Sequence, residues 1–533
     1  MLPGFPHKEN FVTIGRYFFR RVSHLATASF LLVPGILHGQ TLPAGQPIQP
    51  MPADPAIAAA LRQVSTSSVK ATIEKLVSFN NRSTLSSMET GLAPNTGVAT
   101  AANWIESQFK DISANCGGCL EVKRDDFIEP PQIGPRSRIL KPTKITNVYA
   151  ILRGTDPAQA ARMVLITGHY DSRNSDNFNT HAAAPGANDD ASGVAVSLES
   201  ARVLSKLKFP ATIVFAAVAG EEQGLNGSAH LAKLAKSEGW QLDAVLNNDI
   251  VGGDTTPGDT LQDKSAVRVF SEGVPTDATT PQQINAIRSL GAENDSPSRE
   301  LARAVAEIGA TYFSPTSQRP PATPGRARSQ HLRLVPAFHP VLIFRRDRYL
   351  RGGDHISFNQ QGFAAVRFTE WRENFDHQHQ NVRVENGIQY GDLPQFVDFD
   401  YVANVARLNA ATLATLAAAP GPPENVRRIT FALDNNTQLT WDPPAGMPAG
   451  ATYEIVWRDT TDPTWTTVES AGRSAGITLP ISNDNVIFAV RTVDRAGHRS
   501  IAVLPTPLFK PPTTAPSRPA PKQNARTTGT MMK

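Results

Sequence analysis

Histidines and carboxylates recur in a few short, separate motifs in the middle of the chain. His169 and Asp171 follow the apolar run 163–167, and residues two apart in an extended chain point to the same face. Asp171 can therefore accept a hydrogen bond from one imidazole nitrogen of His169, which leaves the other nitrogen free to bind a metal. The other candidates of this kind are Asp189 and Asp190, Glu221 and Glu222, Asp249, and His355.

This combination of residues predicts metal chemistry. Several uncompensated carboxylates in one cleft repel one another strongly, and bound cations are the usual remedy. Oxygen and imidazole ligands without thiolates suit a borderline metal such as zinc, whereas structural zinc sites are rich in sulfur. A lone histidine is more often structural, and paired acids before a helix often only cap it. Because five separate stretches share the pattern, the sequence predicts a catalytic metal site.

A sheet is needed to bring these motifs together. Apolar runs of strand length occur at 145–152, 163–167, 211–219, 242–247, 337–345 and 364–368. Runs of helical length occur at 66–79, 98–112, 191–206, 227–238, 297–310 and 399–419. Their alternation predicts an α/β fold with a mostly parallel sheet covered by helices on both faces. Most of the motifs follow a strand, so we expect their side chains to meet at the carboxyl ends of the strands.

Two long segments interrupt this alternation. Residues 252–296 are rich in Asp, Thr, Gly and Pro, and residues 314–337 include a basic, proline-rich run. Loops of that length without regular structure are usually functional lids or mobile surface. We expect both segments to be loops of one of these two kinds.

The order of the motifs resembles that of a known family. His169-x-Asp171, Gly-Ala-Asn-Asp189-Asp190-x-Ser-Gly, Gly-Glu221-Glu222-x-Gly, Asn-Asn-Asp249 and Gly-Asp-His355 are similar to the motif set of the M28 family of zinc peptidases. The resemblance covers about residues 66–419 and is to the secreted bacterial aminopeptidase type. It implies the zinc exopeptidase fold, two zinc ions per chain and peptide substrates.

The resemblance also implies roles for individual residues. Asp189 is expected to bridge the two zinc ions, and the peptide bond that joins it to Asp190 is expected to be cis. The other implied ligands are His169 and Asp249 for one ion, and Glu222 and His355 for the second. Glu221 is the implied general base, because a carboxylate that binds no metal must take the proton of a metal-activated water. Asp171 completes the implied catalytic set as the partner of His169.

Aminopeptidase activity, the release of N-terminal residues, is the expected function, by analogy with secreted relatives that carry an appended module. A carboxypeptidase of the same family is the first alternative, because Arg351, Arg367 or Arg372 could bind a terminal carboxylate. A glutaminyl cyclase-like acyltransferase is the second, and the resemblance associates that activity with one zinc ion. The third alternative is a non-catalytic binding protein that relies on its C-terminal module.

The character of the chain changes after residue 423. Short, evenly spaced apolar runs between turn residues predict an all-β immunoglobulin-like sandwich at 423–509. Leu439-Thr-Trp441, Tyr453-Glu-Ile-Val-Trp457 and Val490-Arg-Thr-Val resemble a fibronectin type III module, with Phe488 where a tyrosine is usual. No feature of the sequence indicates what this module binds.

The ends of the chain suit an exported protein. Arg16, Arg20 and Arg21 precede the apolar run 25–37, and small or polar residues follow it. This order is typical of a signal peptide, and the run is too short to span a bilayer. The predicted location is therefore secreted or periplasmic, with no stable membrane span. The expected segments are a signal peptide at 1–40, a linker at 41–65, the peptidase unit at 66–419, the sandwich and a disordered tail at 510–533.

The cysteines and the net charge argue against a redox protein, a zinc ribbon and a nucleic-acid-binding protein. Cys116 and Cys119 are the only cysteines, and in an exported chain such a pair is expected to form a disulfide. A thioredoxin-like motif would require a helix start, which Gly117 and Gly118 oppose, and a zinc ribbon would require two more soft ligands. The net charge is +4 over 533 residues without a basic patch, so nucleic acid is not an expected partner.

Overall fold

The computed structural model describes residues 45–313, 338–431 and 433–509. The predicted signal peptide at 1–40, the loop at 314–337 and the tail at 510–533 lie outside the described residues. The described residues belong to one compact unit of the chain. Within the described ranges, no helix combines the length and the apolar character that crossing a membrane requires.

A mixed sheet of eight strands forms the centre of the larger part of the fold. In sheet order the strands are β2 (Leu120–Glu129), β3 (Thr143–Leu152), β5 (Thr212–Val218), β4 (Arg162–His169), β6 (Gln241–Asn248), β9 (Ala365–Glu370), β7 (Ala266–Phe270) and β8 (His339–Ile343). The four inner strands, from β5 to β9, run parallel. Antiparallel pairs flank them on both sides, so the sheet is less parallel than the sequence predicts.

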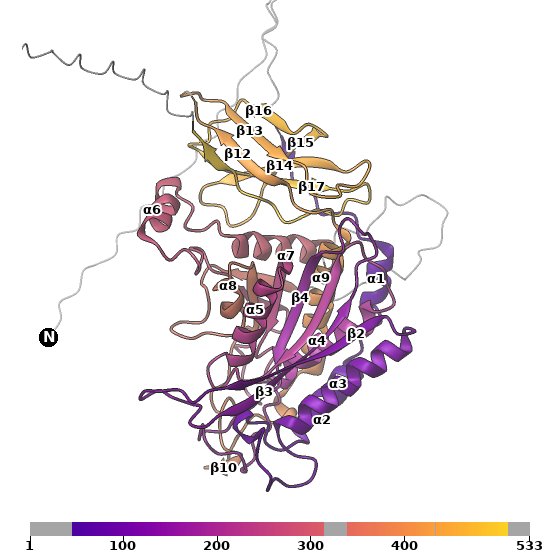
Figure 1. Ribbon diagram of the computed structural model, residues 1–533, viewed down its shortest axis with the longest axis vertical. Helices are drawn as coiled ribbons and strands as arrows, with labels where there is room; N and C mark the ends of the chain where they lie inside the picture. The colour runs from indigo at the N-terminus through magenta and orange to yellow at the C-terminus, as the bar shows by residue number, and fades with distance from the viewer. Residues whose placement is uncertain (1–44, 314–337, 432, 510–533) are drawn as a thin grey trace, which may run out of the picture. The chain divides into compact units, whose positions relative to one another are not determined.

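Helices cover both faces of this sheet, as the sequence predicts (Figure 1). Successive residues of β4 point to opposite sides, so Val164 and Ile166 join one apolar core and Leu165 joins the other. The helices of the larger core are α1 (Pro55–Leu61), α2 (Thr66–Val77), α3 (Val98–Asn115), α4 (Ala191–Leu204), α7 (Pro297–Phe313) and α9 (Phe399–Ala418). Those of the smaller core are α5 (Asn226–Ser237) and α8 (His355–Asn359).

Two segments expected to lack regular structure contain elements. Residues 252–296 include β7, whose sequence Ala-Val-Arg-Val-Phe is almost entirely buried, and helix α6 (Pro281–Leu290), which begins with a capping box at Thr280. The expected linker at 41–65 contains α1, which starts at the N-cap residue Asp54 and buries Ile57 and Leu61. Short apolar runs within polar, proline-containing sequence account for both differences. The remaining short elements are η1 (Thr84–Ser86), η2 (Pro394–Phe396), β10 (Arg383–Glu385) and β11 (Ile388–Tyr390).

The C-terminal region consists of two four-stranded sheets (Figure 1). One contains β1 (Gln46–Pro47), β15 (Thr467–Gly472), β14 (Thr452–Asp459) and β17 (Val486–Val493), and the other contains β16 (Gly476–Leu479), β13 (Thr437–Asp442), β12 (Glu424–Ile429) and β18 (Thr506–Leu508). Leu439 and Trp441 of one sheet share an apolar core with Ile455, Trp457 and Phe488 of the other. The region is therefore all-β, and its fibronectin type III classification stays a prediction.

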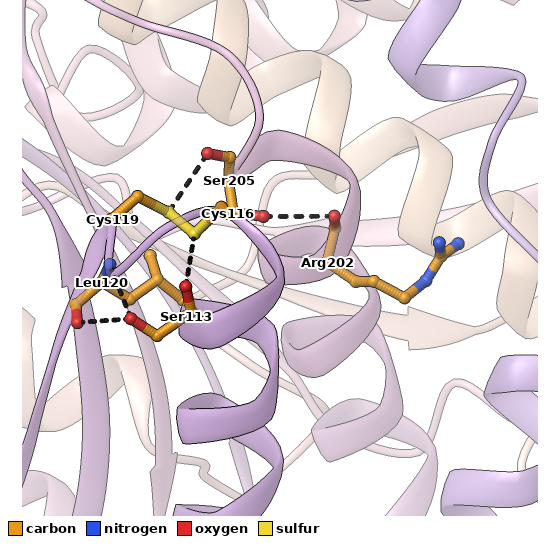
Figure 2. Close-up of a disulfide and its surroundings, with 6 residues drawn as sticks. All are labelled: Ser113, Cys116, Cys119, Leu120, Arg202 and Ser205. Carbon is orange, nitrogen blue, oxygen red and sulfur yellow. Dashed lines mark hydrogen bonds between the residues drawn. A yellow bond between two sulfur atoms is a disulfide. The ribbon is translucent and has the colours of Figure 1, made fainter.

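The predicted disulfide between Cys116 and Cys119 is present (Figure 2). Gly117 and Gly118 both have positive φ, which lets the chain turn between the end of α3 and the start of β2. The hydroxyl of Ser113 donates to the carbonyl of Leu120 at 2.9 Å and accepts from its amide at 3.1 Å. The bridge therefore lies in a turn that is also closed by hydrogen bonds.

Candidate metal centre

The predicted motifs meet at the carboxyl edge of the inner strands. His169 is the last residue of β4, and Asp249 directly follows β6. Glu221 and Glu222 come shortly after β5, and Asp189 lies just before α4. Parallel strands end at the same edge of a sheet, so residues far apart in the sequence become neighbours there.

The carboxylate of Asp189 lies between two imidazole rings. Its Oδ1 atom is 3.1 Å from Nε2 of His169. Its Oδ2 atom is 2.8 Å from Nε2 of His379 and accepts a hydrogen bond from the side-chain amide of Gln378 at 2.9 Å. The side chain is 5% exposed, so both oxygens are largely removed from solvent.

His169 is oriented by the backbone and side chain of Asp171. Its Nδ1 atom lies 3.2 Å from the backbone oxygen of Asp171 and 3.4 Å from the carboxylate Oδ1. A proton on Nδ1 therefore faces Asp171, and Nε2 points toward Asp189 and toward Oδ1 of Asp249, 3.9 Å away. This is the arrangement that the sequence predicts for this pair, with the backbone oxygen as an additional acceptor.

Glu222 and Asp249 each have one oxygen held by an arginine. Nε of Arg173 donates to Oε2 of Glu222 at 2.9 Å, which leaves Oε1 facing Nε2 of His379 at 3.1 Å. Arg367 is fully buried, and its NH1 lies 2.9 Å from Oδ2 of Asp249. In both cases the oxygen that is not held by arginine is the one that faces a histidine.

Asp190 has a structural role next to this cluster. It is the N-cap of α4, and its Oδ1 accepts from the amide of Gly193 at 2.9 Å. Its Oδ2 accepts from the backbone amide of His169 at 3.0 Å, which ties the end of β4 to the start of the helix. The peptide bond between Asp189 and Asp190 is cis, as the resemblance implies.

The structure does not place His355 in the cluster. His355 is fully buried at the start of α8, and its Nε2 lies 2.7 Å from the backbone oxygen of Arg346. Burial lowers the pKa of this imidazole to about 4. The position expected for His355 is taken by His379, which the sequence reasoning missed. His379 follows β9, and the rule that ligands lie beyond the carboxyl ends of strands favours it over a residue that precedes the strand.

The charges of the cluster shift the protonation of its members. Loss of hydration, together with the charge of Asp249, raises the pKa of Glu221 well above its usual value. Burial opposes ionisation of Asp189 too, but His379 and His169 hold its pKa well below the usual value. Burial lowers the pKa of His379, but the neighbouring carboxylates outweigh this effect and raise it to about 10. These shifts arise because carboxylates and imidazoles are packed together away from water.

Comparison with known proteins places this site in a family. The model of peptidase family M28 matches residues 147–299, the stretch that carries His169 and Asp249. A probable zinc metalloprotease of Leptosphaeria maculans is 41% identical over 461 residues, which cover 86% of this chain and 99% of the relative. Another, of Pyricularia oryzae, is 42% identical over 471 residues, which cover 87% of each chain. The chain belongs to peptidase family M28.

Membership of the M28 family confirms the prediction that the chain is an enzyme, a metallopeptidase. Both relatives are fungal, so the bacterial aminopeptidase type stays a prediction. Among solved structures, the LapA aminopeptidase of Legionella pneumophila matches with a TM-score of 0.44 at 19% identity, covering 70% of this chain and 78% of that chain. A Porphyromonas gingivalis glutaminyl cyclase matches with a TM-score of 0.40 at 17% identity, covering 66% and 97%. Likenesses at this level do not distinguish the two activities.

The family implies zinc, and the residues present fit that metal. Nε2 of His169 and Oε1 of Glu222 are buried, and each lies 3.1 Å from another atom of the cluster without the geometry of a hydrogen bond among the described residues. Two groups of three residues have ligand atoms within 4.8 Å of one another: His169, Glu221 and Asp249, and Asp189, Glu222 and His379. Imidazole and carboxylate ligands without thiolate suit zinc in a catalytic site.

Proposed function

We propose that this M28 peptidase is an exported aminopeptidase that binds two zinc ions. One observation carries the proposal: the Asp189 carboxylate faces His169 with one oxygen and His379 with the other. His169 belongs to one group of three potential ligands and His379 to the other. In this proposal His169, Asp189 and Asp249 would hold one ion and Asp189, Glu222 and His379 the other, so Asp189 would be the bridging ligand.

The residues of the cluster have different roles in the proposed hydrolysis of a peptide bond. Zinc bound there would lower the pKa of a water molecule and polarise the scissile carbonyl. Glu221 is the partly exposed member beside His169 and Asp249, which suits a carboxylate that takes a proton and delivers it to the leaving amine. Asp171 keeps the ring of His169 in place while Glu221 moves the proton.

Three arginines bear on the choice between an aminopeptidase and a carboxypeptidase. Arg367 is fully buried against the carboxylate of a predicted metal ligand. Arg351 is paired with Glu373, and Arg372 lies 3.0 Å from Asp259. A substrate carboxylate would have to displace one of these partners. Because all three candidate arginines already have acidic partners, the aminopeptidase is favoured over the carboxypeptidase.

Zinc stoichiometry and a substrate panel test this proposal. The purified protein should contain two zinc ions per chain, and should release the first residue from aminoacyl substrates but not the last residue from peptides with a blocked N-terminus. One zinc ion with cyclisation of N-terminal glutamine would instead indicate the glutaminyl cyclase alternative. Release of C-terminal residues would indicate the carboxypeptidase.

The role of Glu221 is tested by Glu221→Gln. This variant should keep both zinc ions and lose about 10²–10⁴-fold in kcat, because only proton transfer is removed. Glu293→Gln is a matched control, since Glu293 is exposed and lies outside the cluster. Zinc content and kcat of the three proteins would be compared, and a Glu221→Gln variant with wild-type turnover would contradict the assignment of the base.

The proposal includes export and a fibronectin type III-like module at 423–509. Export is supported by the signal-like N-terminal sequence and by the disulfide between Cys116 and Cys119, a bond that persists in oxidising compartments. The module is supported by the two facing β-sheets and their shared core. Detection of the protein in the culture medium, with a mature N-terminus near residue 40, would test the export proposal.

A further inference from the structure

The loop that carries Asp189 is held on one side by a buried arginine. Arg82 lies just before η1 and is fully buried. Its NH1 group donates to the backbone oxygen of Pro185 at 2.6 Å, and NH2 donates to that of Gly186 at 2.9 Å. The same guanidinium donates through Nε to the backbone oxygen of Tyr170, next to His169, at 2.6 Å. The side chain of Arg82 thus bonds both to the segment before Asp189 and to the residue after His169, a second predicted ligand.

A buried aspartate holds the same loop on its other side. Asp392 follows β11 and is 5% exposed. Its carboxylate accepts from the backbone amide of Asn188 at 2.8 and 3.0 Å and from that of Asp189 at 2.7 Å. The backbone oxygen of Asp392 accepts from the amide of Ala187 at 3.2 Å. These bonds fix the backbone at the residue whose side chain faces both histidines.

The packing leaves this loop little freedom between the two charged groups. Gly186 has a φ of +50°, and a Cβ atom at this position would lie 2.5 Å from the backbone oxygen of Asp189 and 2.8 Å from NH2 of Arg82. The side chain of Asn188 is held as well, because its amide donates to both oxygens of Glu370 at 3.1 Å. Displacement of the loop would break charge-assisted hydrogen bonds in a buried environment, which are among the stronger ones in proteins.

We propose that Arg82 and Asp392 are positioning residues for the bridging carboxylate of Asp189. The guanidinium of Arg82 donates to carbonyl groups of the loop, and the carboxylate of Asp392 accepts from its amide groups. The cation therefore binds the negative ends of the backbone dipoles, and the anion binds the positive ends. The pair fixes Asp189 between His169 and His379 without binding metal or substrate. This inference rests on the proposed function, in which Asp189 bridges two zinc ions.

Asp392→Asn tests the amide side of this arrangement in the full-length protein. The asparagine has the same shape but keeps one acceptor oxygen and loses the charge, so the loop should be held less firmly. We expect zinc affinity, measured by competition with a chelator, to fall about 10–100-fold, as is usual when outer groups of a metal site are changed. Asp376→Asn is the matched control, because Asp376 lies in the connection between β9 and β10 and is exposed.

The spectrum of the cobalt-substituted protein is a measurement that a loss of stability alone would not change. The visible absorption spectrum of bound cobalt reports the ligand geometry, and it should change in Asp392→Asn but not in Asp376→Asn. With zinc, kcat should fall while KM changes less, because Asp392 is buried and its carboxylate is bonded to the backbone of the loop. An unchanged spectrum together with wild-type zinc affinity in Asp392→Asn would overturn the proposal.

Arg82→Lys is the second variant and decides the matter if Asp392→Asn fails to fold. Lysine keeps the positive charge but cannot donate to all the carbonyl groups that Arg82 binds. The same changes in zinc affinity and cobalt spectrum are expected, and their absence in a folded Arg82→Lys protein would count against the pair. A wild-type protein that binds fewer than two zinc ions would instead overturn the proposed function, so the two failures are distinguishable.

Discussion

At the scale of single residues, the candidate centre follows one pattern of contacts. Three predicted ligands each have one polar atom engaged by a neighbour and another that faces the cluster. For His169 the neighbour is Asp171, for Glu222 it is Arg173, and for Asp249 it is Arg367. Such partners fix the rotamer of a ligand before the metal arrives, which lowers the entropy lost on binding.

Because His379 lies in the cluster and His355 does not, the two histidines should respond differently to substitution. His379→Ala should lose one zinc ion and most activity, because Nε2 of His379 faces both Asp189 and Glu222. His355→Ala should keep both ions and lose stability by about 1–3 kcal/mol, since it removes a buried side chain bonded to a backbone oxygen. Zinc analysis and denaturant unfolding would check the pair. Loss of zinc in His355→Ala but not in His379→Ala would restore the original assignment.

The sequence predicted most of this centre, but not all of it. His169, Asp189, Glu222 and Asp249 lie next to apolar runs that mark strands or a helix, so their convergence follows from the topology of the sheet. His379 lies nine residues beyond β9, in a segment whose path depends on tertiary contacts. The local sequence around His379 therefore does not mark it as a ligand, whereas His355 follows a glycine- and acid-containing motif.

At the scale of elements, the long apolar helices were predictable, whereas the charged strand β2 and the short strand β7 were not. Helices α2, α3, α4 and α9 begin at the predicted residues, because apolar residues at helical spacing mark them. Strand β2 was missed because its sequence contains six charged residues among ten, and its side chains are mostly exposed or half-buried at the edge of the sheet. Edge strands need only one apolar face, so their pattern is weak.

Helix α1 is linked to the C-terminal region by one histidine. Nδ1 of His498 lies 2.8 Å from Oδ2 of Asp494, and Nε2 lies 3.3 Å from Oδ2 of Asp54, the N-cap of α1. Burial lowers the pKa of His498, but these two carboxylates outweigh that effect and raise it above its ordinary value of 6.5. Both ring nitrogens face carboxylates, so the doubly protonated ring is the form that this site favours.

This arrangement predicts a pH-dependent stability. A raised pKa in the folded state means that the folded protein binds the proton more tightly than the unfolded chain. The stabilisation is therefore fully present below pH 6.5 and is lost as the pH rises through the folded-state pKa of His498. His498→Gln should remove this dependence, whereas His181→Gln, at an exposed histidine, should not. The free energy of unfolding against pH would be compared, and parallel curves for wild type and His498→Gln would disprove the linkage.

At the scale of the whole described chain, the C-terminal sheets are joined to the peptidase by buried charges. Arg458 of β14 is paired with Asp295, which also lies 3.1 Å from NH1 of Arg303 in α7. These three side chains are each 2% exposed. The indole nitrogen of Trp465 donates to Glu300 of α7 at 3.0 Å. Deletion of residues 423–533 would therefore remove one partner from Asp295 and one from Glu300, so loss of activity on deletion would not show that the module acts on substrate.

The last prediction concerns this junction. Arg458→Ala should lower the free energy of unfolding by about 3–5 kcal/mol, because it leaves Asp295 buried with one cation fewer. Arg473→Ala, at an exposed arginine of the same region, should change it by less than about 0.5 kcal/mol. The wild-type protein should unfold in one transition by calorimetry, since the peptidase and the sheets share the network of Asp295, Glu300 and Arg303.

A double-mutant cycle with Asp295→Ala separates the pair from its surroundings. If Arg458 and Asp295 stabilise the junction through each other, the double variant should be less destabilised than the sum of the two single variants. Two separate transitions in the wild type, with the peptidase transition unchanged after removal of 423–533, would mean that the sheets form an independent module. The binding-protein alternative would then regain its structural basis, because a module that folds independently can act as a separate adhesive unit.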